Sequence, residues 1–563
     1  MTTADARLQL LARLYGPDAA PAIEARALAR LSGEQPGNLG PWTERDAWLI
    51  AYPDQFRSPG GAPLAVLGDV LERYLAPEVT GVHVLPFHPS SSDRGFSVID
   101  YAAVETSFGT WDEIVGLSAR YRLMADAVVN HTSAQGVWFQ GYLAGDPRYA
   151  GFFRTADPAA DLSAVVRPRT SPLLTAFEAG PDASTVHVWT TFSADQVDLD
   201  YRNPDVLLAV LDVLLRYRAR GAAAIRLDAI AFAWKVEGTT SINLAGTHDL
   251  IAILRSWLDE VDPALILVTE TNVPHAENVA YLGGEGRREA QAVYQFALPP
   301  LLLHTLATGD PTALVDWARA LDELPAGCTF LNFTSSHDGV GLRPVEGLLS
   351  AAQVAALGEL CARADGVVNM RRASDGTDAP YELASTWFAL MTAIGRDRAL
   401  ERHLLAQAFV LALAGIPLLY THVLLASDND QEGYAASGVG RDLNRADLAV
   451  AELDRMLADP TSTPARSLAA LRRMLRWRAS CEAFHPDARQ QVSHVGRVVI
   501  VDRLAASGVA ARVLLNVADE DVVIALDDHV QRRWRTLDRH GDVPDGSTVR
   551  VPALSSVWLV SEG

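Results

Sequence analysis

AAAIRLDAI, residues 222–230, is an apolar run that carries one charged pair, Arg226 and Asp228. Successive side chains of a β-strand face opposite sides, so these two residues face one side while Ile225 and Leu227 face the other. A guanidinium beside a carboxylate favours the ionised acid and keeps it a competent nucleophile near neutral pH. A buried structural ion pair would give the same pattern. The run therefore predicts a buried strand that ends in a nucleophile or in a structural ion pair.

Apolar runs bounded by loops alternate with helical patterns along most of the chain. The clearest helix is expected at Asp205–Arg220, with Asn203 as its cap and Pro204 in its first turn. Eight strand–helix units predict an α/β fold, the (β/α)8 barrel, whose chemistry lies at the carboxyl ends of the strands. The expected strands are Ala47–Tyr52, Val79–Leu85, Leu123–Val129, Ala223–Asp228, Leu265–Glu270, Ala292–Phe296, Thr329–Thr334 and Ile416–Thr421.

The segments outside the barrel pattern predict additional substructures. Amphipathic helices are expected before the first strand, and two connections are too long to be simple loops, so we expect both to be lids over the barrel mouth. From about Val492 the apolar pattern has period two, with strands expected at Val498–Val501, Ala511–Val517, Val522–Leu526 and Val549–Val560. The expected domains are a helical lead-in (1–44), the barrel (45–131 and 202–480), an inserted B subdomain (132–201), a second lid (339–382) and a C-terminal β-sandwich (490–563).

Composition and charge limit the classes of partner. The 563 residues are 49% hydrophobic and 21% charged, and 48 Lys and Arg against 69 Asp and Glu give a formal net charge of -21. This balance argues against a nucleic-acid or anionic-membrane surface. The three cysteines are far apart and not in a metal-ligand spacing, and no apolar run is long enough to span a bilayer. We expect a cytoplasmic protein that acts on small molecules as a monomer or homodimer.

Ionisable residues cluster where the expected strands end. Asn130-His131 follows the third strand, Asp228 ends the fourth, Glu270 ends the fifth and His337-Asp338 follows the seventh. Two facing carboxyl groups suit glycoside chemistry, in which one attacks the anomeric carbon and the other protonates the leaving oxygen. Asp228 stands beside Arg226 and should stay charged, whereas Glu270 has no adjacent cation and should hold its proton longer.

Four separated blocks resemble, in order, the signature blocks of the α-amylase family of retaining α-glucosidic enzymes. The blocks are DAVVNH (126–131), IRLDA (225–229), TE (269–270) and SHD (336–338). The resemblance implies that Asp228 is the nucleophile, Glu270 the general acid/base and Asp338 the transition-state carboxylate. It also implies donors to the glucosyl unit, namely Arg226, His131 and His337.

The stretch Pro86–Tyr101 is similar to the sucrose-phosphorylase branch of that family. The resemblance implies that Asp93 and Phe96 hold and stack on the terminal glucose. The segment GRDLNR (440–445) is similar to the closing motif of the branch, and Arg441 would pair with Asp93 around the glucose hydroxyls. Such a blind pocket accepts one glucosyl unit and favours disaccharide-like donors over starch.

The second substrate implied by this branch is phosphate, and Arg167 and Arg169 resemble its phosphate-contacting loop. A solvated basic patch is the alternative for these two arginines. For the acceptor, the segments carrying Arg343, Lys235 and Asn272 look more like those of glucosylglycerate phosphorylases. An arginine in the mobile loop suits a carboxylate-bearing acceptor such as glycerate, whereas fructose would have no use for the charge.

These expectations describe a retaining phosphorylase that moves an α-glucosyl unit between a small acceptor, glycerate favoured, and phosphate. Asn130 lies where many starch-degrading relatives place a calcium ligand, but partner ligands cannot be identified. We therefore predict no required metal and no cofactor. The alternatives are a sucrose phosphorylase, an α-glucosidase that uses water, and a non-catalytic barrel subunit.

Overall fold

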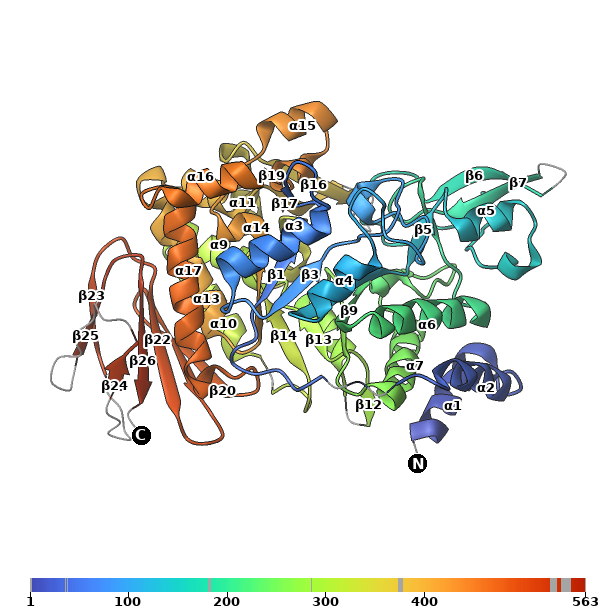
Figure 1. The fold of residues 1–563 in the computed structure, drawn as a ribbon, viewed down its shortest axis with the longest axis horizontal. Helices are drawn as coiled ribbons and strands as arrows, with labels where there is room; N and C mark the ends of the chain where they lie inside the picture. Colours follow the sequence, from blue (N-terminus) through green and yellow to red (C-terminus); the bar gives the residue numbers. More distant parts are fainter. Residues whose placement is uncertain are drawn as a thin grey trace.

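A closed barrel of eight parallel strands forms the centre of the protein (Figure 1). The computed structural model describes residues 3–35, 37, 39–180, 184–284, 286–321, 323–372, 378–526, 534–537 and 548–561. The barrel strands are β1 (Trp48–Ala51), β3 (Gly81–Val84), β4 (Arg122–Val128), β9 (Ala222–Asp228), β10 (Ile266–Thr269), β13 (Ala292–Tyr294), β14 (Thr329–Asn332) and β18 (Ile416–Tyr420). They follow one another around the barrel in chain order, so all eight predicted strands and the (β/α)8 fold are confirmed.

The strand β9 is buried along its whole length, including its two charged residues. Its register places Arg226 beside Asp126 of β4 and Asp228 beside Val128, while Leu227 pairs with Thr269 of β10. Because neighbouring parallel strands end at the same edge, the ionisable residues of the three strands meet there.

Helices surround the barrel and follow most of its strands (Figure 1). The predicted helix at 205–220 is confirmed as α6 (Pro204–Ala219), and the Asn203 side chain accepts from the backbone N–H of Asp205 at 2.9 Å. The other long helices of the barrel are α3 (Pro63–Val70), α4 (Trp111–Ser118), α7 (Ala245–Val261), α9 (Leu298–Thr308), α10 (Thr312–Arg319), α12 (Trp387–Ile394), α13 (Ala399–Ala412), α16 (Val450–Ala458) and α17 (Thr463–Ala479). Shorter ones are α8 (His275–Val279), α14 (Thr421–Leu424) and α15 (Gln431–Ser437).

The N-terminal segment forms the two amphipathic helices expected, α1 (Thr3–Tyr15) and α2 (Ala20–Leu31). Buried Arg7 donates to Glu24, and Glu24 also accepts from the indole N–H of Trp257 in α7 at 2.9 Å. This shared carboxylate fastens the helix pair to the barrel.

Two long connections carry elements of their own beside the barrel. The first contains β5 (His131–Ser133), α5 (Val137–Leu143), β6 (Leu174–Ala179), β7 (Ser184–Trp189) and β8 (Gln196–Asp198). The second contains β15 (Val340–Gly341), α11 (Ala351–Arg363), β16 (Val367–Arg372) and β17 (Asp378–Ala384), with its strands in the order β15-β17-β16. The apolar pattern does not predict this sheet, because Pro380 lies within β17 and Asn369 and Arg371 break the apolar run of β16.

The C-terminal part is all β, as predicted. Five strands form one sheet in the order β20 (Arg489–Val495), β21 (Val498–Leu504), β22 (Ala510–Asn516), β26 (Ser556–Ser561) and β24 (Trp534–Thr536), while β23 (Val522–Ala525) pairs with β25 (Thr548–Val551). The single strand expected at Val549–Val560 is wrong. Pro552 and the left-handed Leu554 (φ 48°) divide it into two strands of different sheets. The exact domain boundaries stay a prediction.

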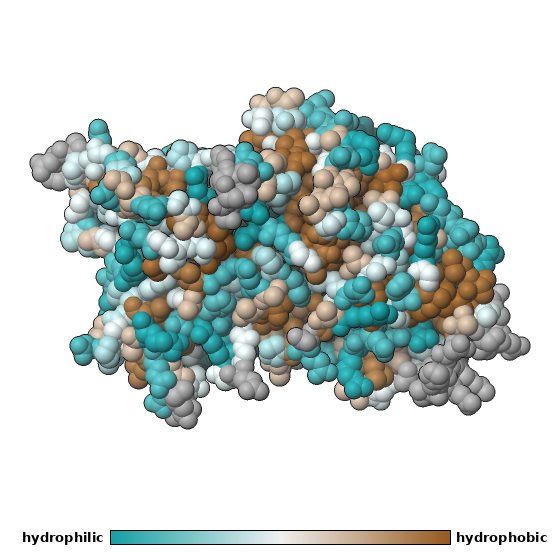
Figure 2. Space-filling view, turned by 180° about the vertical axis from the view of Figure 1, so that it is seen from behind, coloured by the Kyte–Doolittle hydropathy of each residue, from teal (hydrophilic) through white to brown (hydrophobic). Residues whose placement is uncertain are grey.

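The surface is mostly polar. From behind, hydrophilic residues cover much of the molecule and apolar residues appear in separate groups (Figure 2).

Two further pairs of short strands lie outside the barrel, β2 (Phe56–Arg57) with β19 (Leu448–Ala449) and β11 (Gly283–Gly284) with β12 (Arg287–Arg288). Among the described helices, none is long and apolar enough to cross a membrane.

Candidate active site

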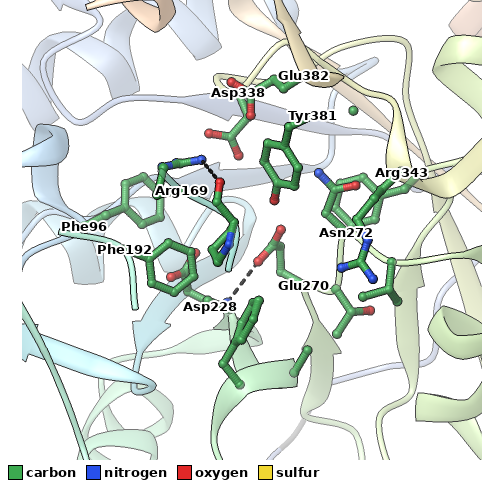
Figure 3. A pocket seen from close by; sticks show the side chains of 18 of the residues that line it. Phe96, Arg169, Phe192, Asp228, Glu270, Asn272, Asp338, Arg343, Tyr381 and Glu382 are labelled. Carbon is green, nitrogen blue, oxygen red and sulfur yellow. Dashed lines mark hydrogen bonds between the residues drawn. The ribbon is translucent and has the colours of Figure 1, made fainter. Parts of the chain in front are cut away.

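Three carboxylates meet in one cavity at the carboxyl edge of the barrel (Figure 3). Asp228 ends β9, Glu270 directly follows β10, and Asp338 lies in the loop after β14. The structure thus brings together the three acids that the sequence placed at strand ends. Their catalytic roles stay a prediction.

Arg226 links Asp228 to Asp126 on the neighbouring barrel strand β4. Its Nη1 donates to Asp228 Oδ1 at 2.8 Å and to Asp126 Oδ1, and Nε2 of His83 is 2.7 Å from the other oxygen of Asp126. Burial opposes ionisation of Asp126, but Arg226 and His83 lower its pKa to about 2. A permanently ionised Asp126 therefore holds the guanidinium against the expected nucleophile.

Asp228 and Glu270 have similar environments. Burial raises the pKa of each carboxyl to about 7, and Arg226 opposes this rise in both. The expectation that Glu270 lacks a nearby cation is wrong, because Nη2 of Arg226 reaches from the neighbouring strand to 3.9 Å from Glu270 Oε2. The hydrogen bond to Asp228 is much shorter, so Arg226 favours an ionised Asp228 and a protonated Glu270.

The backbone between these acids also contributes to the site. Ala229, the residue after the expected nucleophile, has a left-handed conformation (φ 49°), and its N–H donates to Glu270 Oε2 at 2.9 Å. Positive φ is unfavourable in free energy for a residue with a side chain, so the surrounding structure must stabilise this conformation. This strained turn fixes the position of Glu270 relative to Asp228.

Asp338 is surrounded by cationic and neutral donors. Arg441 Nη1 lies 2.8 Å from Asp338 Oδ1, Arg445 Nη2 lies 3.4 Å from the same oxygen, and His337 Nε2 lies 3.4 Å from Oδ2. Burial opposes ionisation, but these groups, Arg441 first, hold the pKa of Asp338 far below its usual range. Asp338 is therefore an anion throughout the physiological pH range.

The predicted pairing of Arg441 with Asp93 is electrostatic and not a direct contact: burial opposes ionisation of Asp93, but Arg445 and then Arg441 lower its pKa. The arginine that contacts Asp93 is Arg445, whose Nη1 lies 3.4 Å from Asp93 Oδ1. Arg441 instead forms a two-point contact with Glu382 of β17, at 2.9 and 2.7 Å. Arg441 lies in the short helical segment Gly440–Asn444, and Arg445 directly follows it. Both reach the site, so the sequence motif could not tell their partners apart.

Aromatic and imidazole groups form one wall of the cavity. The ring of Phe96 stacks on His337 with centroids 5.0 Å apart, and Nε2 of His131 is 3.0 Å from the carbonyl oxygen of Phe96. Burial lowers the pKa of His337 to about 3, so its imidazole is neutral at pH 7. Asp93, Phe96, His131 and His337 all line the cavity, as expected for contacts to a sugar.

Lys235 does not lie among the residues lining the cavity, so its prediction as a substrate contact is wrong. Its side chain is buried, with Nζ 2.9 Å from Asn130 Oδ1 and 3.5 Å from Asp198 Oδ2. It is also the only lysine among the 48 Lys and Arg residues of the chain. Its ammonium group supplies a cation beside Asn130, the residue that lies where many starch-degrading relatives place a calcium ligand.

A metal site has little support in the described residues. They contain no group of three or more His, Cys, Asp and Glu side chains that could hold an ion. The expectation that no metal is required stays a prediction for chelation experiments.

The cavity contains more cations than the acidic composition suggests. The predicted Arg167, Arg169, Asn272 and Arg343 all line it, and in Figure 3 Arg169 and Arg343 lie on opposite sides of Glu270. Sequence reasoning missed further lining residues, namely Phe192, Gln196, Arg371, Tyr381 and Glu382. These residues lie in the long connections, whereas the sequence pointed to site residues at the carboxyl ends of the barrel strands.

Comparisons with known proteins agree with this geometry. The family described as alpha amylase, catalytic domain, matches residues 52–339. This chain belongs to the α-amylase family. Its fold is shared by the crystal structure of sucrose 6F-phosphate phosphorylase from Thermoanaerobacter thermosaccharolyticum, with a TM-score of 0.73 and 24% identity over 84% of this chain and 94% of that one.

Curated relatives resemble the chain over most of its length. Glucosylglycerate phosphorylase of Allomeiothermus silvanus is 45% identical over 92% of this chain and 93% of its own. The protein of that name from Escherichia coli is 42% identical over 85% of this chain and 86% of its own. Sucrose phosphorylase of Agrobacterium vitis is 31% identical over 80% of this chain and 91% of its own.

Proposed function

We propose that this α-amylase family member is a retaining glucosylglycerate phosphorylase. The observation that carries the proposal is one cavity that contains the acid pair Asp228 and Glu270 together with four arginines that are not bound to these acids or to Asp338. A neutral disaccharide donor and water would offer these cations no anion, whereas phosphate and a carboxylate acceptor would. Three relatives above 40% identity carry that name.

The reaction is a double displacement. Glu270 gives its proton to the glycosidic oxygen while Asp228 attacks the anomeric carbon, so the glycerate leaves and a glucosyl-enzyme forms. Phosphate then attacks the same carbon, gives a proton back to Glu270 and breaks the bond to Asp228, and the product is α-glucose 1-phosphate. Asp338 stabilises the oxocarbenium-like transition states as a nearby anion.

The remaining residues bind the substrates. Asp93, held by Arg445, and the Phe96–His337 stack hold the glucosyl unit. Arg167 and Arg169 bind phosphate, and Arg343 with Asn272 binds the acceptor. In Figure 3 Arg169 lies on the opposite side of Glu270 from Arg343 and Asn272.

Product analysis tests the proposal. Purified protein is given glucosylglycerate or sucrose, with and without phosphate, and glucose 1-phosphate and free glucose are measured. We expect phosphate-dependent glucose 1-phosphate from glucosylglycerate. The same product from sucrose alone would assign a sucrose phosphorylase, free glucose irrespective of phosphate would assign a hydrolase, and no turnover of either donor would contradict the proposal.

A further inference from the structure

Arg371, on strand β16 of the second connection, lines the catalytic cavity although its chain segment carries no recognisable motif. Its Nη2 lies 2.7 Å from Glu346 Oε1, while its Nε is shielded from solvent and has no hydrogen-bond partner among the described residues. A buried donor on a charged group costs free energy when it stays unpaired. Such an atom at a cavity wall therefore indicates a ligand.

Two other polar atoms of the same cavity share this property. Nε of Arg343 and the amide oxygen of Asn272 are also shielded from solvent without a partner among the described residues. The three side chains offer two cationic donors and one acceptor. An acceptor molecule with a carboxylate and a neighbouring hydroxyl group would satisfy all of them.

The six arginines of the cavity form three pairs, and two of these pairs come from the long connections. Arg226 and Arg441 are bound to the catalytic acids, whereas Arg167 and Arg169 come from the first connection and Arg343 and Arg371 from the second. Figure 3 places Arg169 and Arg343 on opposite sides of Glu270. Two separate sets of arginines suit two anions, the phosphate on one side and the acceptor carboxylate on the other.

We propose that Arg371 is a specificity-determining residue that binds the carboxylate of the acceptor together with Arg343. Glu346 holds one side of its guanidinium and leaves the Nε side for the ligand. Arg343 and Glu346 lie in one short segment. This segment therefore supplies Arg343 as one carboxylate-binding arginine, and its Glu346 holds the other, Arg371, in place. The inference rests on the proposed function, because it names how that site selects its acceptor.

The test runs the reaction in the synthetic direction, from α-glucose 1-phosphate to D-glycerate or to glycerol. We expect Arg371→Gln to lower kcat/KM for glycerate by about ten- to a hundredfold, as the loss of a charge-assisted hydrogen bond does. Turnover of glycerol should change less than about threefold, because glycerol has no carboxylate. Arg371→Lys should retain part of the preference, and Arg363→Gln on the exposed face of α11 is the matched control.

A second measurement separates acceptor binding from phosphate binding. Exchange of labelled phosphate into glucose 1-phosphate requires formation of the glucosyl-enzyme but no acceptor, so Arg371→Gln should lower it far less than it lowers glycerate turnover. Equal losses with glycerate and glycerol, or an equally large loss of exchange, would overturn the inference. A wild-type enzyme that uses glycerol but not glycerate would instead refute the proposed acceptor, so the two failures are distinguishable.

Discussion

At the scale of single residues, Arg226 determines the ionisation of the site. It contacts Asp126, Asp228 and Glu270 at once, and only the first two contacts are hydrogen bonds. Since the cation stabilises the anion it touches most directly, one shared arginine can keep a nucleophile ionised next to an acid that is still protonated. The division of labour between the acids therefore comes from geometry that spans three strands.

The pH dependence of the reaction follows from the pKa values of about 7 for Asp228 and Glu270. Activity needs an ionised Asp228 and a protonated Glu270, so the rate should fall on both sides of a narrow maximum near neutral pH. With α-glucosyl fluoride, whose leaving group needs no proton, Glu270→Gln should lose the alkaline limb of kcat/KM and keep the acid limb. An alkaline limb that survives in this variant would contradict the assignment of Glu270.

Lys235 should be essential for stability. Lys235→Met removes a buried ammonium group and leaves the buried carboxylate of Asp198 unpaired, which costs about 3–5 kcal/mol of unfolding free energy. Lys235→Arg should also lower Tm, since the larger planar group does not match the compact site.

Two further measurements complete this test by thermal denaturation. The double variant Lys235→Met/Asp198→Asn should recover part of the loss, because it removes the unpaired charge. Chelators should leave the Tm of the wild-type protein unchanged. A chelator-sensitive Tm would show that a metal ion is required after all.

At the scale of elements, the second connection was the hardest part to predict. The barrel strands are continuous apolar runs, and that pattern is sufficient to locate them. The strands β16 (VVNMRR) and β17 (DAPYELA) mix apolar and charged residues without a regular pattern and are only partly buried, so neither periodicity nor hydrophobicity marks them. Tyr381, Glu382 and Arg371 were missed for this reason, although the acids at the ends of barrel strands were found.

Glycine substitutions test how this connection is anchored. Gly339, next to Asp338, has φ +89°, and an added Cβ would lie 2.2 Å from the carbonyl oxygen of Leu383 in β17. We expect Gly339→Ala to displace the β15–β17 pairing and to lower kcat/KM at least tenfold.

The matched control for this substitution is Gly347→Ala. Gly347 has a similar φ of +81°, but no atom lies within 4 Å of an added Cβ. The variant should therefore lose only the free energy of about 1–2 kcal/mol that a side chain costs in a left-handed backbone. Activity and Tm are measured for both variants. Equal effects would show that strain alone, and not contact with β17, explains the loss.

At the scale of the whole molecule, one face of the C-terminal sheet belongs to the core of the barrel, while its other face has a separate buried cluster. The buried cluster of the barrel continues through Phe484 into Trp558 of β26, whose ring centroid lies 5.1 Å from that of Phe484 and 5.9 Å from that of Trp477 in α17. Buried Arg503 of β21 donates to the carbonyl oxygen of Ala412 in α13 at 3.0 Å. The two parts should therefore unfold together.

Calorimetry can check this expectation. Trp558→Ala removes a fully buried indole and should cost about 3–5 kcal/mol. If the parts share a core, the whole transition moves to lower temperature as one peak. A second peak that appears while the main one stays in place would show that the C-terminal sheet unfolds independently.

The buried position of Lys235 also affects how the protein can be chemically modified. Every other cationic side chain that could reach solvent is an arginine or a histidine, and the one lysine lies beneath the site. Amine-directed reagents such as succinimidyl esters and aldehydes should therefore react with the folded chain chiefly at its α-amino group. The enzyme could then be coupled to a support at a single point, in one orientation, with its catalytic cavity untouched.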